Sequence, residues 1–367
     1  MRENVKYYQE DNYAQLVRTV DLKKDFTNND FVYVDEFAYD FLWRVQLKEP
    51  NIVLPNIGAN IGEKYYVSPK DLPKEKNVLG PNAILLRSKC NDTHFVFFRL
   101  STSSYDNEMK KLVGASGQPK FNKTDLKKVR LFIPSLKEQK KISYFLGLLE
   151  ERIATQNKII EDLKLLKSAI IEEHYKKTEK QIVSVADLGQ PFNVGSLSKE
   201  DLSETGHLCI IYGELFTTYG ATINVVESHT HKFHGMTLSR KGDLLFPSST
   251  TVDAVSLIAP SVINVDGVVL GGDMFGIHIS SDFNPQYLSY FFNLIARNQF
   301  AKYAKGSTII HLHYKEIEKA KLLLPSLEEQ NRMATCMAAF DERITIENTI
   351  QKSLMIQKQY LLRLMFI

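Results

Sequence analysis

One stretch of the sequence occurs twice, and this repeat constrains the fold more than any other feature. Pro134–Gln139 reads Pro-Ser-Leu-Lys-Glu-Gln, and Pro325–Gln330 reads Pro-Ser-Leu-Glu-Glu-Gln. The offset of 191 residues holds without a gap from Pro134 to Ile170, and 12 of these 37 positions are identical in the second copy. A repeat at a fixed offset predicts two copies of one structural unit.

Each copy of the repeat predicts a long helix. Each begins at a proline and carries the Ser-x-x-Glu spacing of a capping box, Ser135 to Glu138 and Ser326 to Glu329, and no proline follows. About 41 residues at 1.5 Å per residue give a helix of roughly 60 Å. A helix of that length needs a partner, and the only matched partner is the other copy. The alternative is two unrelated amphipathic surface helices.

A seven-residue frame fits both helices and predicts an antiparallel coiled coil with a pseudo-twofold axis. One row of the frame is followed by a second row three residues later: Ile142, Leu149, Gln156, Leu163 and Ile170 with Phe145, Arg152, Ile159 and Leu166 in the first copy, and Met333, Phe340, Glu347, Leu354 and Leu361 with Cys336, Arg343, Ile350, Gln357 and Leu364 in the second. Both copies carry polar residues at the same central layer. We expect Arg152, Gln156, Arg343 and Glu347 to set the register of the pair, because a buried polar layer fixes register at a cost in stability.

Composition bounds the class of protein. The 367 residues suffice for two or three domains. The net charge of +3 is too small to indicate that the whole surface attracts nucleic acid, so any basic surface must be local. Three isolated cysteines (Cys90, Cys209 and Cys336) argue against a disulfide framework or a zinc site. Without an apolar signal core or an 18-residue apolar run, we expect a soluble cytoplasmic protein that does not contact a membrane.

Four segments alternate along the chain. Residues 1–133 form a first globular domain, 134–178 the first repeated helix, 179–324 a second domain and 325–367 the second helix. Short apolar runs in the first domain predict strands separated by turns: Phe31–Val34, Asn51–Leu54, Ala83–Leu86, Phe95–Phe98 and Val129–Ile133. We expect an α/β (α+β) fold with a mixed sheet in each of two similar domains.

The second domain repeats the plan of the first. Gly242–Phe246 is a predicted strand entering a polar loop, as Asn51–Leu54 is, and Val268–Asp273 and Gly276–Ile279 predict further strands. Pro285–Phe300 predicts an aromatic helix. The N-terminal match is displaced: Val17–Leu22 pairs with Cys209–Leu215, so the first domain begins about 20 residues late relative to the second. Its first strand is absent, supplied from elsewhere in the chain, or lost to a different start codon.

This organisation resembles the specificity subunit of type I restriction–modification enzymes. The resemblance rests on the Pro-Ser-Leu-x-Glu-Gln helix that closes each domain, on Gly242-Asp243-Leu244-Leu245 and on the Gly114–Gln118 loop, and it covers essentially the whole chain. It implies two target recognition domains that each read half of a split double-stranded DNA sequence. It also implies that the helices act as a spacer and dock two modification (methyltransferase) subunits, which carry S-adenosylmethionine. Restriction subunits that use ATP and Mg²⁺ complete the implied complex, and the chain itself would hold no cofactor.

Other motifs are compatible with chemistry of the chain's own. Asn284-Pro285-Gln286-Tyr287 is similar to the Asn-Pro-Pro-Tyr motif of amino-methyltransferases, but without the second proline and without a glycine-rich cofactor loop it favours a helix cap. His229, His231 and His234, and also His311 and His313, have metal-like spacing but no carboxylate or cysteine beside them. We therefore predict no catalytic residues and no metal site.

Base readout requires side chains that donate and accept hydrogen bonds from loops beside a rigid sheet. Two loops in each domain qualify: the turn after the predicted strand Asn51–Leu54 or Gly242–Phe246, and the loop before the repeated helix. The candidates are Asn56, Asn60, Lys64, Gln118, Lys120, Asn122 and Lys123 in the first domain, and Ser248, Ser249, Thr250, Thr251, Ser307, Thr308, His311 and His313 in the second.

The leading hypothesis is a non-catalytic DNA-recognition subunit that directs its partners. One rival is a methyltransferase with a fused recognition domain, which would need about 150 residues for a cofactor fold that no stretch here can supply. The other is a coiled-coil scaffold whose domains bind proteins. Salt-sensitive, sequence-selective DNA binding would separate the first hypothesis from the scaffold.

Overall fold

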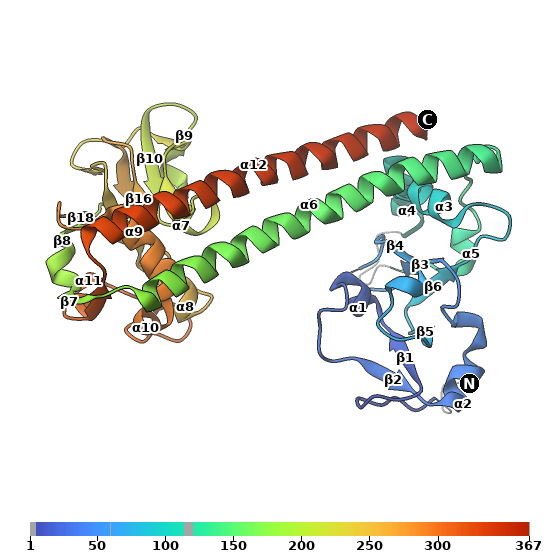
Figure 1. Cartoon of the computed structure of the whole chain (residues 1–367). Coiled ribbons are helices and arrows are strands. Elements are labelled where there is room, and N and C mark those ends of the chain that lie inside the picture. Colours follow the sequence, from blue (N-terminus) through green and yellow to red (C-terminus); the bar gives the residue numbers. More distant parts are fainter. Residues whose placement is uncertain (1–4, 59, 114–119, 367) are drawn as a thin grey trace. The chain divides into compact units, whose positions relative to one another are not determined.

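The computed structural model describes residues 5–58, 60–113 and 120–366, and the chain forms two compact units. The first unit comprises residues 1–157 and 349–367, and the second comprises residues 158–348. Each unit therefore contains one globular domain and one half of each long helix (Figure 1). Within the described ranges, no helix has both the length and the apolar character needed to cross a membrane.

The repeated sequence forms the two longest helices, as predicted. Helix α6 spans Leu136–Lys177 and helix α12 spans Leu327–Met365. At each start a serine side chain accepts a long hydrogen bond from the main chain of the following glutamate: Ser135 Oγ from Glu138 N–H at 3.4 Å, and Ser326 Oγ from Glu329 N–H at 3.4 Å. The two copies of the motif thus start their helices in the same way.

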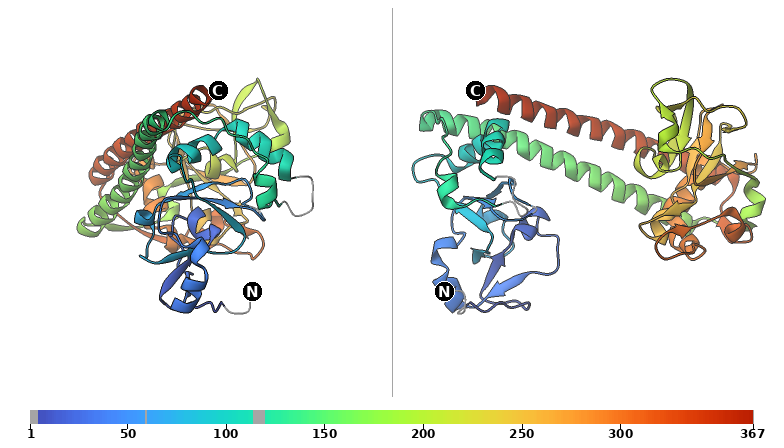
Figure 2. Two further views of the ribbon diagram at one scale, coloured as in Figure 1. Left: turned by 90° about the vertical axis from the view of Figure 1, so that its right-hand side faces the viewer. Right: turned by 180° about the vertical axis from the view of Figure 1, so that it is seen from behind.

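The two helices run antiparallel within each unit. In the first unit Leu146 lies in one cluster with Leu362, Glu150 accepts from Lys358 Nζ at 2.6 Å, and Asn157 accepts from Gln351 at 2.5 Å. Residue numbers rise along one helix as they fall along the other. In the second unit Lys167 pairs with Asp341, and His174 contacts Glu329 at 2.7 Å. Figure 2 shows the C-terminal half of α6 beside the N-terminal half of α12 in the second unit.

The seam between the helices differs from the predicted one in its second row. Side chains of the first predicted row, such as Met333, are buried or half-buried, but Phe145, Arg152, Ile159, Leu166, Arg343, Ile350, Gln357 and Leu364 of the second row are exposed. The row that faces the partner helix lies four residues after the first row: Leu146, Ile153, Ile160, Lys167 and His174, and in α12 Met337, Ile344, Gln351 and Lys358. A heptad alternates steps of three and four residues, so the sequence alone allowed either order.

This shift changes the central polar layer. The predicted frame placed Arg152 and Arg343 in the seam. Arg152 is instead exposed, and Arg343 pairs with Glu347 of its own helix. Gln156 and Glu347 are buried. Cross-helix ion pairs instead come from Lys167 with Asp341 and from Lys358 with Glu150.

The first domain consists of two three-stranded sheets with helices between the second sheet and α6. Strand β1 pairs antiparallel with β2 and parallel with β5, and β3 lies between β4 and β6, antiparallel to both. The elements are β1 (Ala14–Val17), α1 (Thr19–Lys23), β2 (Val32–Val34), α2 (Glu36–Phe41), β3 (Asn51–Pro55), β4 (Tyr65–Val67), β5 (Asn77–Leu79), β6 (Ala83–Leu86), α3 (Thr93–Leu100), α4 (Ser103–Val113) and α5 (Lys123–Leu126), with 3-10 turns η1 (Trp43–Val45) and η2 (Pro69–Asp71).

The second domain contains two five-stranded sheets, of order β13-β17-β10-β12-β9 and β11-β16-β14-β18-β8, and the strand pairs β15-β19 and β20-β7. Its strands are β7 (Gln181–Ser184), β8 (Gly189–Asn193), β9 (Leu202–Ser203), β10 (His207–Ile211), β11 (Thr222–Ile223), β12 (His229–Thr230), β13 (Thr237–Leu238), β14 (Asp243–Pro247), β15 (Ser249–Thr250), β16 (Ser261–Ile263), β17 (Val269–Gly271), β18 (Met274–Ile279), β19 (Ile310–His311) and β20 (Lys321–Leu324). Its helices are α7 (Glu214–Thr217), α8 (Ala254–Leu257), α9 (Pro285–Tyr290), a π turn η5 (Phe291–Ile295), α10 (Arg297–Ala301) and α11 (Tyr314–Ile317), with 3-10 turns η3 (Val185–Leu188) and η4 (Lys199–Asp201).

The two domains share a core plan. Parallel pairing of β1 with β5 corresponds to that of β10 with β17, and β3 and β14 are each the central strand of a sheet and pair antiparallel with both neighbours. A capped helix follows in each domain: Asp92 accepts from Phe95 N–H at 2.8 Å at the start of α3, and Asn284 accepts from Tyr287 N–H at 2.8 Å at the start of α9. The cap at Asn284 is the one that the sequence favoured over a methyltransferase motif.

Two predicted strands of the first domain are not strands. Phe95–Phe98 lies in helix α3, where Phe95 and Phe98 are both buried; a short apolar run does not distinguish a strand from a buried helix. Val129–Ile133 forms no described strand, whereas its counterpart Lys321–Leu324 is β20 and pairs with β7. Strand β7 is the first strand of the second domain, and no strand among the first domain's described residues corresponds to it.

The glutamine of each repeated motif attaches its domain to its helix. Gln139 Oε1 accepts from the main-chain N–H of Asp92 at 2.9 Å, and its Nε2 donates to Pro134 O at 2.8 Å. Gln330 does the same, accepting from Asn284 N–H at 3.0 Å and donating to Pro325 O at 2.9 Å. Both glutamine side chains are buried, and each satisfies one main-chain donor and one main-chain acceptor at the junction of its domain and helix.

Candidate nucleic-acid interface

In each unit the turn after the central strand is paired with the segment before the long helix. In the second unit β15 pairs antiparallel with β19, opposing Ser249 to His311, and Leu312 N–H donates to Ser248 O at 2.9 Å. In the first unit Ile57 forms a bridge with Lys120, and Phe121 N–H donates to Asn56 O at 3.1 Å. The two candidate loops of each domain, distant in sequence, therefore lie together at one end of the sheet.

In the second domain, main-chain hydrogen bonds close the base of the loop that precedes α12. Lys305 and His311 exchange two main-chain hydrogen bonds of 2.9 and 2.7 Å, which enclose Gly306, Ser307 and Thr308. Gly306 has φ of +120°, and a Cβ there would stand 2.0 Å from Ile309 O, so only glycine fits. Ser307 and Thr308 are exposed on this loop. Their hydroxyl groups are held ready to donate or accept hydrogen bonds.

The other candidates of the second domain divide by exposure. Thr251 and His313 are exposed and His311 is half-buried, with the two imidazole rings stacked at 6.0 Å between centroids. Ser248 and Ser249 are buried, and Thr250 Oγ1 accepts from Val252 N–H at 3.2 Å. The buried serines hold the turn in place, while the exposed side chains are free to meet a ligand.

In the first domain three candidates are exposed, and two of them are lysines. Lys120 and Lys123 are exposed, whereas Asn122 caps α5, accepting from Thr124 N–H at 2.7 Å and from Asp125 N–H at 3.0 Å. Main-chain donation to Asp125 and the nearby Lys128 hold the pKa of this carboxyl below its usual value. Gln118 lies outside the described residues.

The turn after β3 carries charges that are already paired. Lys64 Nζ donates to Asp106 at 2.5 Å, and Asn60 Oδ1 accepts from Lys23 Nζ at 3.0 Å. Lys23 also pairs with Glu63 at 2.8 Å. Partial burial would raise the pKa of Glu63, but hydrogen bonds from Lys23 and Tyr65 outweigh it and lower that pKa. These contacts order the turn; Lys120 and Lys123, in the segment paired with it, take part in no ion pair with another described residue.

The remaining chemical motifs do not form a site. Asn284 uses its side chain to cap α9 and to donate to Asn331 Oδ1 at 2.7 Å. Nowhere in the described ranges do three or more His, Cys, Asp or Glu side chains gather in a way that could hold a metal ion. The described side chains at the loops offer hydrogen bonding and positive charge, which suit recognition.

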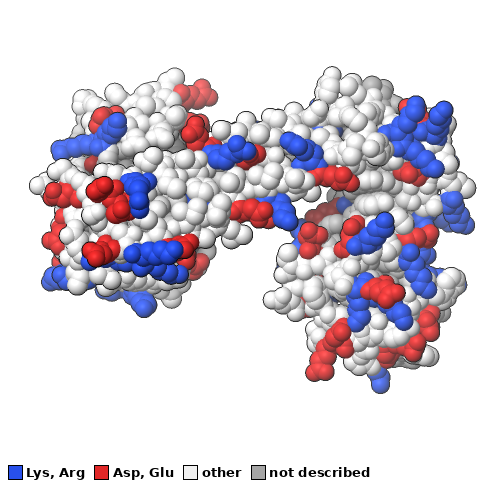
Figure 3. Space-filling view, in the orientation of Figure 1, with Lys and Arg blue, Asp and Glu red and all other residues white. Residues whose placement is uncertain are grey.

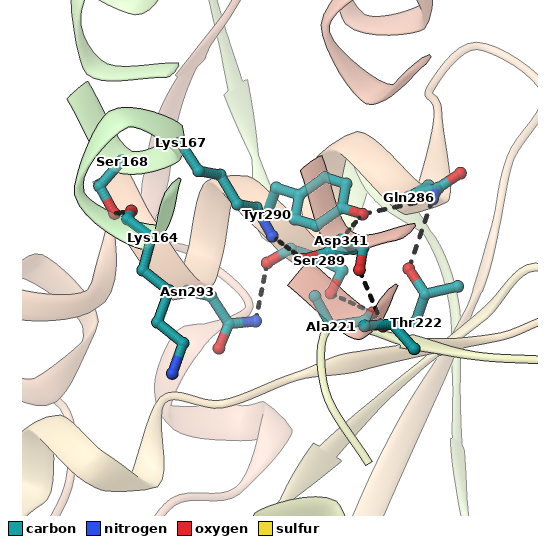
Figure 4. A network of polar contacts seen from close by, with 11 residues as sticks. Lys164, Lys167, Ser168, Ala221, Thr222, Gln286, Ser289, Tyr290, Asn293 and Asp341 are labelled. Atoms are coloured by element: carbon teal, nitrogen blue, oxygen red, sulfur yellow. Dashed lines mark hydrogen bonds and ion pairs between the residues drawn. The ribbon is translucent and has the colours of Figure 1, made fainter. Parts of the chain in front are cut away.

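A polar network attaches the second domain to both helices. Tyr290 of α9 donates to Asp341 Oδ2 at 2.6 Å, and Lys167 of α6 pairs with the same carboxylate (Figure 4). Gln286 lies within 3.4 Å of both Tyr290 Oη and Thr222 Oγ1. Burial, followed by the hydrogen bond to Asp341, raises the pKa of Tyr290, so its hydroxyl stays protonated and donates.

The first unit has the corresponding arrangement. Glu150 of α6 accepts from Lys358 of α12 at 2.6 Å and lies 3.4 Å from His94 of α3. Burial would raise the pKa of Glu150, but His94 and Lys358 outweigh it and lower that pKa. The offset of 191 relates Glu150 to Asp341 and Lys167 to Lys358, so the same ion pair occurs once in each unit. This recurrence was visible in the sequence, but a search for exposed loop residues passes over it.

Comparisons with known proteins agree with this architecture. The profile of a protein family described as type I restriction modification DNA specificity domain matches residues 8–165 and again residues 177–355. Two proteins of Methanocaldococcus jannaschii are similar: the type I restriction enzyme MjaVIII specificity subunit, 21% identical over 87% of this chain and 79% of its own length, and the putative type I restriction enzyme MjaX specificity subunit, 22% identical over 78% and 70%.

Solved structures show the same fold. The type I restriction–modification S subunit from M. genitalium has a TM-score of 0.56 at 14% identity, with 87% of this chain and 83% of that chain covered. A chain from a structure concerned with complex assembly and conformational transition of the type I system has a TM-score of 0.54 at 12% identity, with 85% and 80% covered.

Proposed function

Since the chain belongs to the family of type I restriction modification DNA specificity domains, we propose that each of its two domains reads one half of a bipartite DNA target for a type I restriction–modification complex. The chain is the specificity subunit of such a system and is not itself a catalyst. The family profile matches it twice, and each match takes in one domain and most of the helix that follows.

One observation carries the proposal: the framework is repeated while the exposed loop chemistry differs. The buried glutamine, the Lys–carboxylate pair and the paired loops recur in both units. At the loops, however, the first domain exposes Lys120 and Lys123, and the second exposes hydroxyl and imidazole groups. Two domains alike in structure and different in hydrogen-bonding surface suit two half-sites of different sequence.

The exposed face of the helices supports docking of partner subunits. Rows that point away from the seam carry large apolar side chains, among them Ile159 and Leu165 of α6 and their counterparts Ile350 and Ile356 of α12. Exposed apolar surface on this scale marks a protein-interaction site. Because the same positions recur in both copies, we propose that two copies of one partner, the modification subunit, dock here. S-adenosylmethionine would then be bound by that partner, and ATP and Mg²⁺ by restriction subunits.

An exchange of domains tests the proposal. Residues 181–324 are replaced by the matching domain of a relative, the variant is co-expressed with modification subunits, and methylated sites are mapped across the host DNA. We expect one half of the target to change and the other half and the gap to remain. The unaltered chain without modification subunits is the control, and it should methylate nothing. Simultaneous change of both halves, or methylation by the chain alone, would contradict the proposal.

A further inference from the structure

The two copies of the repeat differ in charge where each domain joins its helix. Residues 120–141 contain eight Lys or Arg and two acidic residues, a net charge of +6. The matching residues 311–332 contain four of each, a net charge of zero. The whole chain carries only +3, so this stretch of the first unit is the local basic surface that composition could not reveal.

These basic side chains are exposed and mostly unpaired. Ion pairs hold Lys128 to Asp125 at 3.2 Å and Lys141 to Glu138 at 4.0 Å. In the described part of the chain none of the other six takes part in an ion pair: Lys120, Lys123, Lys127, Arg130, Lys137 and Lys140. Lys110 and Lys111 at the end of α4 are exposed as well, and Lys111 lines a small cavity together with Lys128. Figure 3 shows Lys and Arg side chains gathered over the end of the first unit that α4, α5 and the start of α6 form.

We propose that this basic surface, residues 120–141 with Lys110 and Lys111, binds the phosphate backbone of duplex DNA beside the half-site that the first domain reads. The inference rests on the proposed function. The surface is continuous with the candidate interface, because it begins at Lys120, which is paired with Ile57. Separate lysines on three elements act as point charges, which suits positioning on a sequence-independent backbone. The second domain, neutral at the same place, would make no such contact.

The repeat supplies the variants that test this. Lys127, Lys137 and Lys140 correspond to Glu318, Glu328 and Asn331, residues that the same fold accommodates in the second unit. The triple variant Lys127→Glu, Lys137→Glu, Lys140→Asn therefore reverses charge without a foreign side chain. The control is Lys70→Glu, Lys89→Glu, Lys199→Asn, which changes the net charge equally at exposed positions elsewhere.

The measurement is the salt dependence of binding by the full chain with its modification subunits to a duplex carrying its mapped target. Each phosphate contact contributes about 0.9 to the slope of log K against log salt. We expect the triple variant to lower that slope by about 2 to 3 and to shorten the footprint on one flank only. The bases read and the control's slope should stay unchanged. Trimming the duplex on the first domain's side should lower the wild-type slope equally, and trimming the other side should not.

Two results would overturn the inference. One is an unchanged slope in the triple variant together with symmetric effects of trimming. The other is loss of modification-subunit binding in the triple variant and in Phe132→Ala with the slope unchanged; Phe132 is 85% exposed in the same stretch, and a protein partner would use it whereas a phosphate backbone would not. If the wild-type complex showed no selectivity for a bipartite duplex, the proposed function itself would fail, and this inference with it.

Discussion

Substitution of the glutamine of the repeated motif has a predicted effect on stability, and this effect can be compared between the two units. Replacing Gln330 by Ala removes the acceptor for Asn284 N–H and the donor to Pro325 O, of which Pro325 is buried and Asn284 is half-buried. A buried polar group left without a partner costs about 1–3 kcal/mol. We therefore expect Gln330→Ala to destabilise the second unit by about 2–4 kcal/mol. Gln139→Ala should destabilise the first unit by less, because Pro134 is exposed and water can replace the lost donor.

Hydrogen exchange measured by segment is the suitable assay, because a chain with two units does not unfold in one step. At about 1.4 kcal/mol for each factor of ten, the loss corresponds to about 30- to 1,000-fold faster exchange. Gln330→Ala should accelerate exchange in α9 and the first turns of α12 and leave α3 unaffected. Gln139→Ala should show the reverse pattern.

Two controls bracket this expectation. Gln330→Glu keeps the acceptor for Asn284 N–H but buries a carboxylate whose second oxygen faces Pro325 O, so at neutral pH its effect should be at least as large as that of Gln330→Ala. Glu328 lies in the same turn but is exposed, so Glu328→Ala should have little effect on hydrogen exchange. Unchanged protection of α9 in Gln330→Ala, or equal acceleration in both units, would refute the assignment of this glutamine as the link between domain and helix.

Two further expectations concern the helices. Contacts with His94 and Lys358 lower the pKa of Glu150 in the folded chain, so they stabilise the first unit above the ordinary glutamate pKa of 4.5 and lose this contribution as the pH falls below it. In urea titrations between about pH 3 and 6 the wild type should therefore lose more stability than Glu150→Gln. Inserting one heptad into each helix, after Asn157 and after Asn348, keeps the seam and lengthens each helix by about 10 Å. Mapped methylation sites should then show the same bases read, with a gap between the half-sites that is longer by about three base pairs. An unchanged gap would show that the length of the helices does not set the distance between the half-sites.

The repeat carried most of what the sequence could predict, because an offset of 191 residues with shared identities reports a shared structure directly. It predicted both long helices, their antiparallel pairing and the similar domains. The order of steps in the heptad was ambiguous, however, since Phe145 and Leu146 are both apolar and only burial shows which one faces the partner. Phe95–Phe98 was misassigned for a related reason: apolar content reports burial, and a short run lacks the length to reveal a helical period.

The sequence predicted which two loops of each domain are candidates, but it did not predict that they pair or which of their side chains are available. Loop position follows from the strands on either side, and the repeat shows that both domains use the same pair of loops. Which side chain is free depends on contacts that sequence does not show, such as the pairing of Lys64 with Asp106 or the cap formed by Asn122. Charged and amide groups in ordered loops often bind their own chain first, and only the remainder is available to a ligand.

The distribution of differences between the copies follows from what each position does. A change at Gln139 or Gln330 leaves main-chain groups without a hydrogen-bond partner. A change of one member of a Lys–carboxylate pair leaves the other member as a half-buried charge without its partner. These positions therefore match in both units. Loop positions whose side chains satisfy no buried group carry no such cost, so Lys120 and His311 differ at equivalent places on equivalent backbones. A chain constructed in this way can change what one domain recognises while the helices, and with them the attachment of each domain, stay the same.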